Sequence, residues 1–183
     1  MEAALFEPSS LWAWVRRRLD QRFALAWLLA IAAAGGLVVA VATEIGVREF
    51  NTDWNYVAGY SVQAGRGAGP FMLLWAIAAG LSVAQGLCGG LLLPMYGKAR
   101  DWMGGLAVGI VGSIPIYATG LALILMPGIL LVCIAFLVSC AWWGSGARFL
   151  LGVPDGEAAD HVVASIVTGG VAVSILAAGL AAA

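Results

Sequence analysis

Four long stretches of this sequence carry no charged residue, and this spacing constrains the fold more than any other feature. They span residues 23–43, 67–97, 102–147 and 162–183. A helix needs about 20 mostly apolar residues to cross the hydrocarbon core of a bilayer, and each stretch is long enough. The whole sequence is 62% hydrophobic and 10% charged, whereas ordinary soluble domains are about 25% charged. The sequence therefore predicts an all-α membrane helix bundle that forms one integral-membrane domain, residues 1–183.

The longest uncharged stretch decides how many times the chain crosses the bilayer. As one straight helix, residues 102–147 would reach about 69 Å, against a hydrocarbon core of about 30 Å. The stretch must therefore fold back once, and Met126-Pro127-Gly128 near its middle suits a turn. We predict five transmembrane helices, near residues 23–46, 70–94, 104–125, 127–149 and 161–182.

The distribution of lysine and arginine predicts the orientation. With the N-terminus in the cytoplasm, the inside segments hold seven cationic residues: Arg16, Arg17, Arg18, Arg22, Lys98, Arg100 and Arg148. The outside segments hold only Arg48 and Arg66. Cytoplasmic loops are enriched in lysine and arginine, so we expect a cytoplasmic N-terminus and an exterior C-terminus. The alanine, glycine and arginine bias fits a GC-rich bacterium, and we expect the bacterial inner membrane.

Residues 9–22, which precede the first predicted span, have the pattern of an interfacial amphipathic helix. Leu11, Trp14, Val15 and Leu19 recur at helical spacing and form one apolar stripe. The basic run Arg16-Arg17-Arg18 in the same segment should contact anionic lipid. The bilayer, and other membrane proteins, are the expected partners of this helix. Its candidate contact residues are Leu11, Trp12, Trp14, Arg16, Arg17 and Arg18.

A second candidate contact surface is the long exterior segment, residues 47–69. It is rich in aromatic residues, and aromatic side chains are enriched at protein interfaces. We therefore take Trp54, Tyr56 and Tyr60 as further contact residues. Most of the other tryptophans lie toward predicted span ends, where we expect them to anchor the helices at headgroup level: Trp27, Trp75, Trp102, Trp142 and Trp143.

Few residues within the predicted spans offer chemistry. Gln85 lies near the middle of the second span and can hydrogen-bond across a helix contact. The only histidine, His161, is expected in the acidic loop before the last span. We find no spacing typical of a catalytic set, a metal site or a haem site. The sequence therefore predicts a protein that is not an enzyme, with no cofactor, no metal and no nucleic-acid partner.

Small residues are abundant and predict close helix packing. Gly86 and Gly90 form one G-x-x-x-G pattern, and Gly105 and Gly109 form another. This spacing lets two helix backbones approach closely, and we expect packing within the chain rather than between copies. Pro115 lies inside the third predicted span, where its missing N–H should bend the helix.

Three short segments resemble the Yip family, membrane proteins named for their interaction with Ypt/Rab GTPases, and especially its prokaryotic branch. They are Leu5-Phe6-Glu7-Pro8 followed by Leu11-Trp12, then Ile114-Pro115, and finally residues 146–158 (GARFLLGVPDGEA) before the last span. The resemblance implies a five-span architecture and a non-enzymatic role. The acidic N-terminal tail of the eukaryotic members has no counterpart here, so the resemblance does not extend to Rab binding.

Three functions are compatible with these observations. The first is an accessory or scaffold subunit of a membrane assembly, which acts by protein–protein contact. The second is a small-solute permease or channel, with Gln85 and hydroxyl residues along its path. The third is a lipid-binding, membrane-shaping protein that works through residues 9–22. The scarcity of titratable residues within the spans favours the first.

Overall fold

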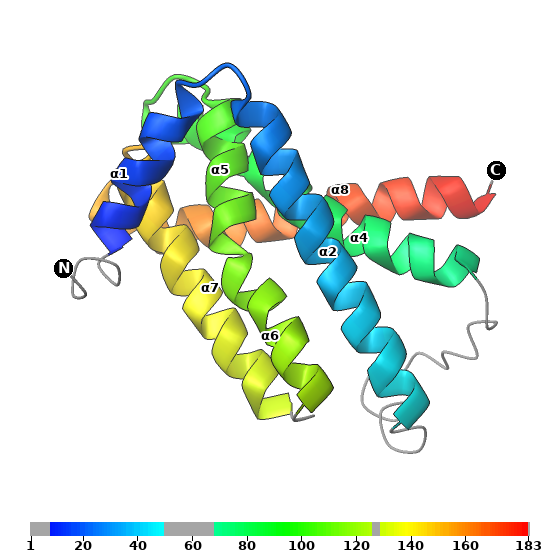
Figure 1. Cartoon of the computed structure of the whole chain (residues 1–183). Helices are drawn as coiled ribbons and strands as arrows, with labels where there is room; N and C mark the ends of the chain where they lie inside the picture. Colours follow the sequence, from blue (N-terminus) through cyan, green and yellow to red (C-terminus); the bar gives the residue numbers. More distant parts are fainter. Residues whose placement is uncertain (1–7, 50–67, 126–128, 183) are drawn as a thin grey trace.

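The computed structural model describes residues 8–49, 68–125 and 129–182, and these residues are almost entirely helical. The part of the chain that it describes contains no β-strand. The elements in order are α1 (Pro8–Leu19), α2 (Ala24–Glu49), α4 (Ala68–Leu92), the 3₁₀ helix η2 (Leu93–Tyr96), α5 (Trp102–Gly112), α6 (Ile114–Leu125), α7 (Ile129–Phe149), the 3₁₀ helix η3 (Asp155–Glu157) and α8 (Ala158–Ala182). The predicted all-α class is confirmed (Figure 1).

Five segments are long and apolar enough to cross a bilayer, as predicted. They are Ala24–Ala42, Trp75–Tyr96, Trp102–Gly120, Leu131–Phe149 and Asp155–Leu176. Each includes an 18-residue stretch that is apolar on average and holds at most two charged residues, which is close to the length that a membrane span requires. The chain therefore has the architecture of a polytopic membrane protein.

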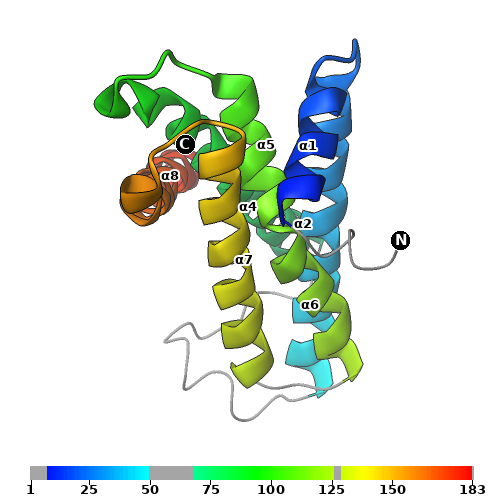
Figure 2. The same cartoon turned by 90° about the vertical axis from the view of Figure 1, so that its left-hand side faces the viewer.

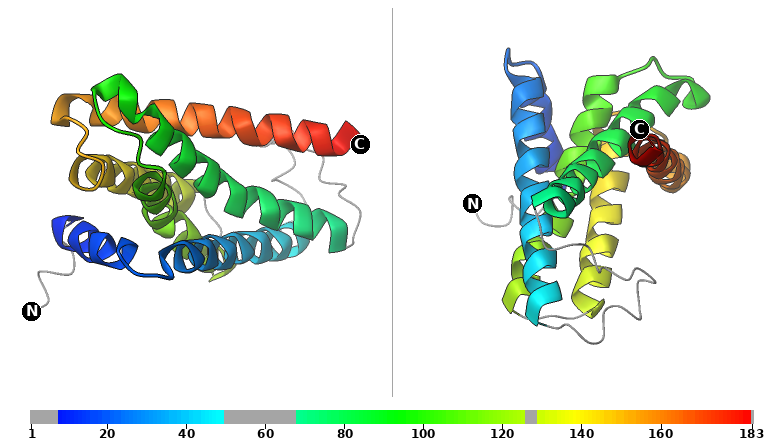
Figure 3. Two further views of the ribbon diagram at one scale, coloured as in Figure 1. Left: turned by 90° about the horizontal axis from the view of Figure 1, so that it is seen from above. Right: turned by 90° about the vertical axis from the view of Figure 1, so that its right-hand side faces the viewer.

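The helices form two groups that meet along α4 and α5. Helix α6 continues from the end of α5, and α2 and α7 run alongside these two helices, while α1 lies against α5 and α7 at one end of the bundle (Figures 1 and 2). Helix α8 packs mainly on α4 and runs across the first group, so that it is seen nearly end-on in Figure 2. Seen from above, α4 and α8 lie next to each other over much of their length (Figure 3).

Local sequence explains where the central helix α5 begins. The Asp101 side chain accepts a hydrogen bond from the Gly104 backbone N–H at 2.8 Å, which caps the helix. Before it, Gly97 has φ +69° and ends η2 in the left-handed conformation that glycine adopts without strain. The chain therefore turns sharply between α4 and α5, and the two helices pack as neighbours.

The third span is interrupted rather than gently bent, which differs from the single helix predicted over residues 104–125. Helix α5 ends at Gly112 and α6 begins at Ile114, with Ser113 between them. Pro115 stands in the first turn of α6, where a missing N–H costs little, and it disfavours helical geometry just before it. The Ser113 hydroxyl donates to Gly109 O at 2.6 Å, so this side chain bonds to the end of α5.

Two predicted features lie outside the described residues. The proposed turn at Met126-Pro127-Gly128 is one, although α6 ends at Leu125 and α7 begins at Ile129, side by side with it (Figures 1 and 2). The exterior contact residues Trp54, Tyr56 and Tyr60 are the other. Their contact role remains a prediction.

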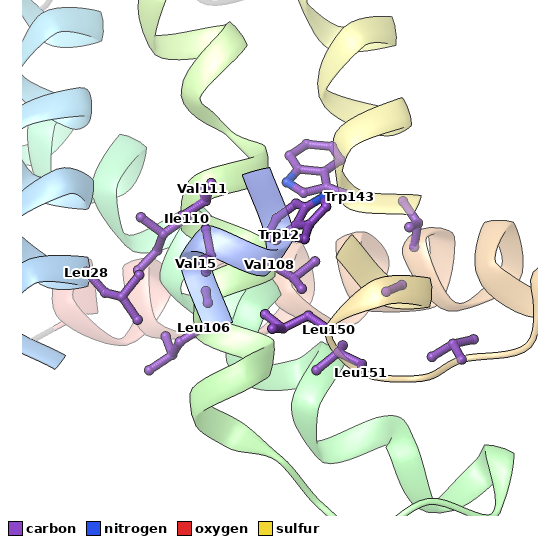
Figure 4. Close-up of a cluster of buried hydrophobic side chains, with 14 of the residues drawn as sticks. Trp12, Val15, Leu28, Leu106, Val108, Ile110, Val111, Trp143, Leu150 and Leu151 are labelled. Carbon is purple, nitrogen blue, oxygen red and sulfur yellow. The ribbon is translucent and has the colours of Figure 1, made fainter. Parts of the chain in front are cut away.

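The hydrophobic core lies where α1, α2, α5 and α7 meet. Figure 4 shows Trp12 and Val15 from α1, Leu28 from α2 and Trp143 from α7 gathered around α5. Both tryptophan rings are almost completely buried. Burying large aromatic side chains removes much apolar surface from the surroundings and fixes the helices around them.

Candidate functional site

Helix α1 is attached to the helix bundle through Trp12. The Trp12 side chain is 1% exposed, and its indole Nε1 donates a hydrogen bond to Ser145 Oγ on α7 at 2.8 Å. Its ring lies over Gly146, where an added Cβ would stand 2.7 Å from ring atom Cζ2. One turn later, Val15 is fully buried as well. The predicted amphipathic helix is therefore a docked part of the bundle.

This docking sets which face of α1 is buried, and the predicted stripe differs from it at one position. Trp12 belongs to the buried face with Val15, while Trp14 is 39% exposed. Trp14 instead makes an edge-to-face contact with Trp27 of α2, with 5.5 Å between ring centroids. The physical reason is that Gly146 has no side chain, which leaves room for the Trp12 indole ring on α7.

The opposite face of α1 is cationic and open. Arg16, Arg17 and Arg18 are all exposed. The Arg18 guanidinium carbon lies 5.3 Å from the centroid of the Trp14 ring, and its Nη1 donates to Gln21 Oε1 at 3.1 Å. A guanidinium over an indole is a favourable cation–π arrangement. The structure thus holds the arginines and the exposed indole on one surface.

The segments that follow α1, η2 and α7 lie toward the same end of the bundle (Figures 1 and 2). They carry Arg22, Lys98 and Arg100, and Arg148 ends α7 nearby. The Arg148 guanidinium pairs with Asp155 at 3.5 Å, and both side chains are largely exposed. The cationic residues predicted for the inside segments therefore share one end of the structure.

The two G-x-x-x-G patterns meet between α4 and α5. A Cβ added to Gly86 would lie 2.7 Å from Gly105 O, and one added to Gly109 would lie 2.6 Å from Gly86 Cα. One added to Gly105 would lie 2.7 Å from Gly90 Cα. Backbone thus touches backbone along this contact, which we call the glycine seam (Gly86, Gly90, Gly105 and Gly109).

A small cavity lies beside the glycine seam, and its mostly apolar wall includes a few polar side chains. Gln85 of α4, Trp143 of α7, and His161 and Ser165 of α8 contribute to its lining. Its volume is about 10 Å³, which is close to the space that one water molecule needs. Gln85 is buried at the α4–α8 contact, where a Cβ added to Gly169 would stand 2.7 Å from Gln85 Cα.

His161 lies in the wall of this cavity. Its prediction as a loop residue is wrong. Helix α8 begins at Ala158, which places His161 inside the helix with 2% of its surface exposed. Its ring meets Tyr96 edge to face, with 5.2 Å between centroids. Its Nδ1 is buried and has no hydrogen-bond partner among the described residues. The acidic side chain of Asp160 in the first turn favours this helix start.

Ser139 Oγ on α7 is likewise buried without a hydrogen-bond partner among the described residues, whereas several other polar groups are paired within the bundle. The Tyr117 hydroxyl donates to Ser82 Oγ at 2.6 Å and joins α6 to α4. Trp143 Nε1 donates to Gly109 O at 3.3 Å, and Trp75 Nε1 donates to Ala33 O at 2.8 Å. The prediction that Trp143 anchors a span end is wrong, because this indole is buried in the core.

Helix α8 has an open outer face. Val163, Val167 and Val171 on this face are each more than half exposed. Gly170 and Ser174 fall on the same face by helical spacing, and a Cβ added to Gly170 would meet nothing within 4 Å. We call these five residues the α8 outer face.

Within residues 8–49, 68–125 and 129–182, no group of three His, Cys, Asp or Glu side chains is placed to hold a metal ion. No family model matches this sequence, and neither a curated protein nor a solved structure is significantly similar to it. The chemistry of the docked α1, the α8 outer face and the cavity beside the glycine seam is therefore the basis for a functional proposal.

Proposed function

We propose that this chain is a non-enzymatic membrane protein that acts by protein–protein contact, as an accessory or scaffold subunit of a larger membrane assembly. The observation that carries this proposal is the α8 outer face. In the span containing α8, 22% of residues are buried within the chain, compared with 67% in the span that contains α5. A helix this open has room for a partner along most of its length.

The composition of the α8 outer face supports a helical partner. Lipid tails are as apolar as valine, so helices in a bilayer associate through close packing rather than through the hydrophobic effect. Gly170 and Ser174 are small and lie one turn apart, next to the exposed Val167 and Val171. Such a surface lets another helix approach closely, as the glycine seam does inside the chain.

The test is extraction in a mild detergent, followed by sizing and mass spectrometry of what co-purifies. We expect a complex larger than the single chain, and recovery of the chain only as a lone monomer would contradict the proposal. A photo-crosslinking residue at Val167 should capture the partner. The same residue at Leu37, which is exposed on α2, is the matched control and should capture little.

A steric variant locates the contact. Gly170→Leu should abolish both co-purification and crosslinking from Val167, because the added side chain fills the space that the partner helix needs. Gly144→Leu is the control, since Gly144 on α7 is equally free of neighbours within 4 Å. Unchanged complex formation by Gly170→Leu would remove α8 from the proposal.

A small-solute permease is the second candidate, and the polar side chains in the cavity beside the glycine seam favour it. Gln85, His161 and Ser165 are three buried polar residues around one space. Flux of water or small neutral solutes into reconstituted vesicles tests this function. Gln85→Leu should then abolish flux while the helical circular dichroism spectrum is retained, and equal flux in protein-free vesicles would reject it.

We also propose the bacterial inner membrane and a cytoplasmic N-terminus. The cationic residues at the α1 end of the bundle support this orientation through the positive-inside rule. A green fluorescent protein fused after Ala183 should then be dark and a fused alkaline phosphatase active.

Membership of the Yip family stays a proposal, supported by the segments around Pro8, Pro115 and Pro154.

A further inference from the structure

We propose that the corner between α1 and α2 binds the headgroup of an anionic phospholipid. This corner comprises Trp14, Arg16, Arg17, Arg18, Arg22 and Phe23. Helix α1 and the start of α2 lie at the opposite side of the fold from α8 (Figures 2 and 3), and this corner takes a different ligand from the α8 outer face. The inference therefore stands or falls separately from the proposed protein contact.

Uncompensated positive charge is the first argument. Four arginines fall between residues 16 and 22, where Asp20 is the only acidic residue. Arg148 has an ion-pair partner in Asp155, whereas Arg16 and Arg17 have no carboxylate within ion-pair distance in the part of the chain that the structure describes. A cluster of this kind attracts a phosphate group, and guanidinium groups match phosphate geometry in a bidentate manner.

The position of the corner is the second argument, and it favours a lipid over an acidic protein. The first apolar span begins at Ala24, so Arg22 and Phe23 stand at headgroup level when that span crosses a bilayer. Phe23 is 75% exposed, and the exposed Trp14 ring lies beside Arg18. Apolar and aromatic side chains next to cations suit the boundary between headgroups and acyl chains.

Preorganisation is the third argument. An isolated amphipathic helix must order itself on the lipid surface, and this ordering weakens binding. Here Trp12 and Val15 hold α1 on the bundle before any lipid arrives. The arginine side chains therefore start from a fixed backbone, and a lipid headgroup orders only the side chains.

The test uses the full-length protein purified in detergent and titrated with equal amounts of phosphatidylglycerol and phosphatidylcholine of identical acyl chains. Native mass spectrometry then counts the lipids retained. We expect phosphatidylglycerol to be retained preferentially. The triple variant Arg16→Gln, Arg17→Gln, Arg18→Gln should lower that preference by about a hundredfold, since each cation near an anionic surface contributes about fivefold.

The control removes positive charge elsewhere. The double variant Arg48→Gln, Arg66→Gln should keep the preference for phosphatidylglycerol. Trp12→Ala should reduce the preference although no charge is lost, and Trp12→Phe, which keeps the packing, should preserve more of it. If the triple variant loses its helical circular dichroism spectrum, the single variant Arg17→Gln is tested instead. We expect it to lose about fivefold of the preference for phosphatidylglycerol.

Three results would overturn the inference. One is equal retention of both lipids by the native chain, and another is a preference that the arginine variants leave unchanged. The third is displacement of the bound phosphatidylglycerol by millimolar inorganic phosphate, which would indicate a general anion site rather than a lipid site. If Gly170→Leu loses the protein complex but keeps the preference for phosphatidylglycerol, the result supports a lipid site that is separate from the protein contact.

Discussion

Glycine serves two different kinds of contact in this bundle. Along the glycine seam, backbone meets backbone between α4 and α5. At three other places a glycine lies under an aromatic ring, and an added Cβ would overlap that ring: Gly35 under Tyr117, Gly112 under Trp143 and Gly146 under Trp12. The first kind joins two neighbouring helices. The second kind joins elements far apart in sequence, including α1 to α7.

The two kinds differ in how they respond to change. A backbone contact cannot be relieved by rotating a side chain, whereas an aromatic ring can shift if its surroundings give way. The aromatic contacts, however, bury far more apolar area at each position. We therefore expect removal of a ring to cost more than one added methyl group, and one added methyl group to cost more in the seam than elsewhere.

The largest expected effect is that of Trp143→Ala. It empties the space over Gly112 and removes the indole hydrogen bond to Gly109 O, which keeps the one from the Ser113 hydroxyl. Core Trp→Ala substitutions cost about 3–5 kcal/mol of unfolding free energy. Reversible unfolding in mixed micelles, followed by circular dichroism, measures the loss. Trp102→Ala is the control, because that side chain is about half exposed, and an equal loss in both variants would contradict the assignment of Trp143 to the core.

The next effect is that of Gly105→Ala in the glycine seam. The new Cβ would approach Gly90 N to 2.5 Å and Gly90 Cα to 2.7 Å, so the two helices must separate. Overpacking of this kind costs about 1–3 kcal/mol, and it outweighs the helix propensity that alanine adds. The same unfolding assay measures it. A variant as stable as the native chain would mean that α4 and α5 are not in backbone contact.

A smaller effect is expected from Ser145→Ala, which removes the acceptor of the Trp12 indole and leaves the ring in place. The lost hydrogen bond connects α1 to α7 across 133 sequence positions. Such a bond contributes about 1 kcal/mol. Proteolysis at the α1–α2 connection is the readout, and we expect faster cleavage than in the native chain. Ser174→Ala, whose hydroxyl bonds only to its own helix, should cleave at the native rate.

The sequence predicts the spans well because a bilayer acts on local composition. Twenty apolar residues without charge are recognisable wherever they occur, and the described helices follow the uncharged stretches. The glycine seam was predictable for a similar reason, since both G-x-x-x-G patterns are local. The seam also needs the sharp turn at Gly97, which sets the two patterns against each other.

The aromatic contacts and the cavity beside the glycine seam depend on partners that are distant in sequence. Trp12 and Trp14 both lie among apolar residues of one short helix, and the contacts that bury Trp12 come from Ser145 and Gly146 of the distant helix α7. His161 looked like a loop residue because Pro154 and Gly156 precede it closely. In the structure α8 begins only two residues after that glycine, and the histidine turns toward α4 and Tyr96.

The smallest change, Gly170→Ala, sharpens the comparison because it is the same substitution as in the seam with the opposite sign. Gly170 has no neighbour within 4 Å, so the added methyl group meets no other helix of this chain. Alanine is favoured over glycine in a helix, and we expect a gain of about 0.5 kcal/mol in unfolding free energy. The unfolding assay on the isolated chain measures this gain. In the assembly, the same methyl group would stand between α8 and its partner and weaken their association. A variant that is more stable as an isolated chain but binds its partner less well would distinguish glycines that pack within the chain from glycines that contact a partner. A loss of stability in the isolated chain would show that α8 packs differently from the arrangement described.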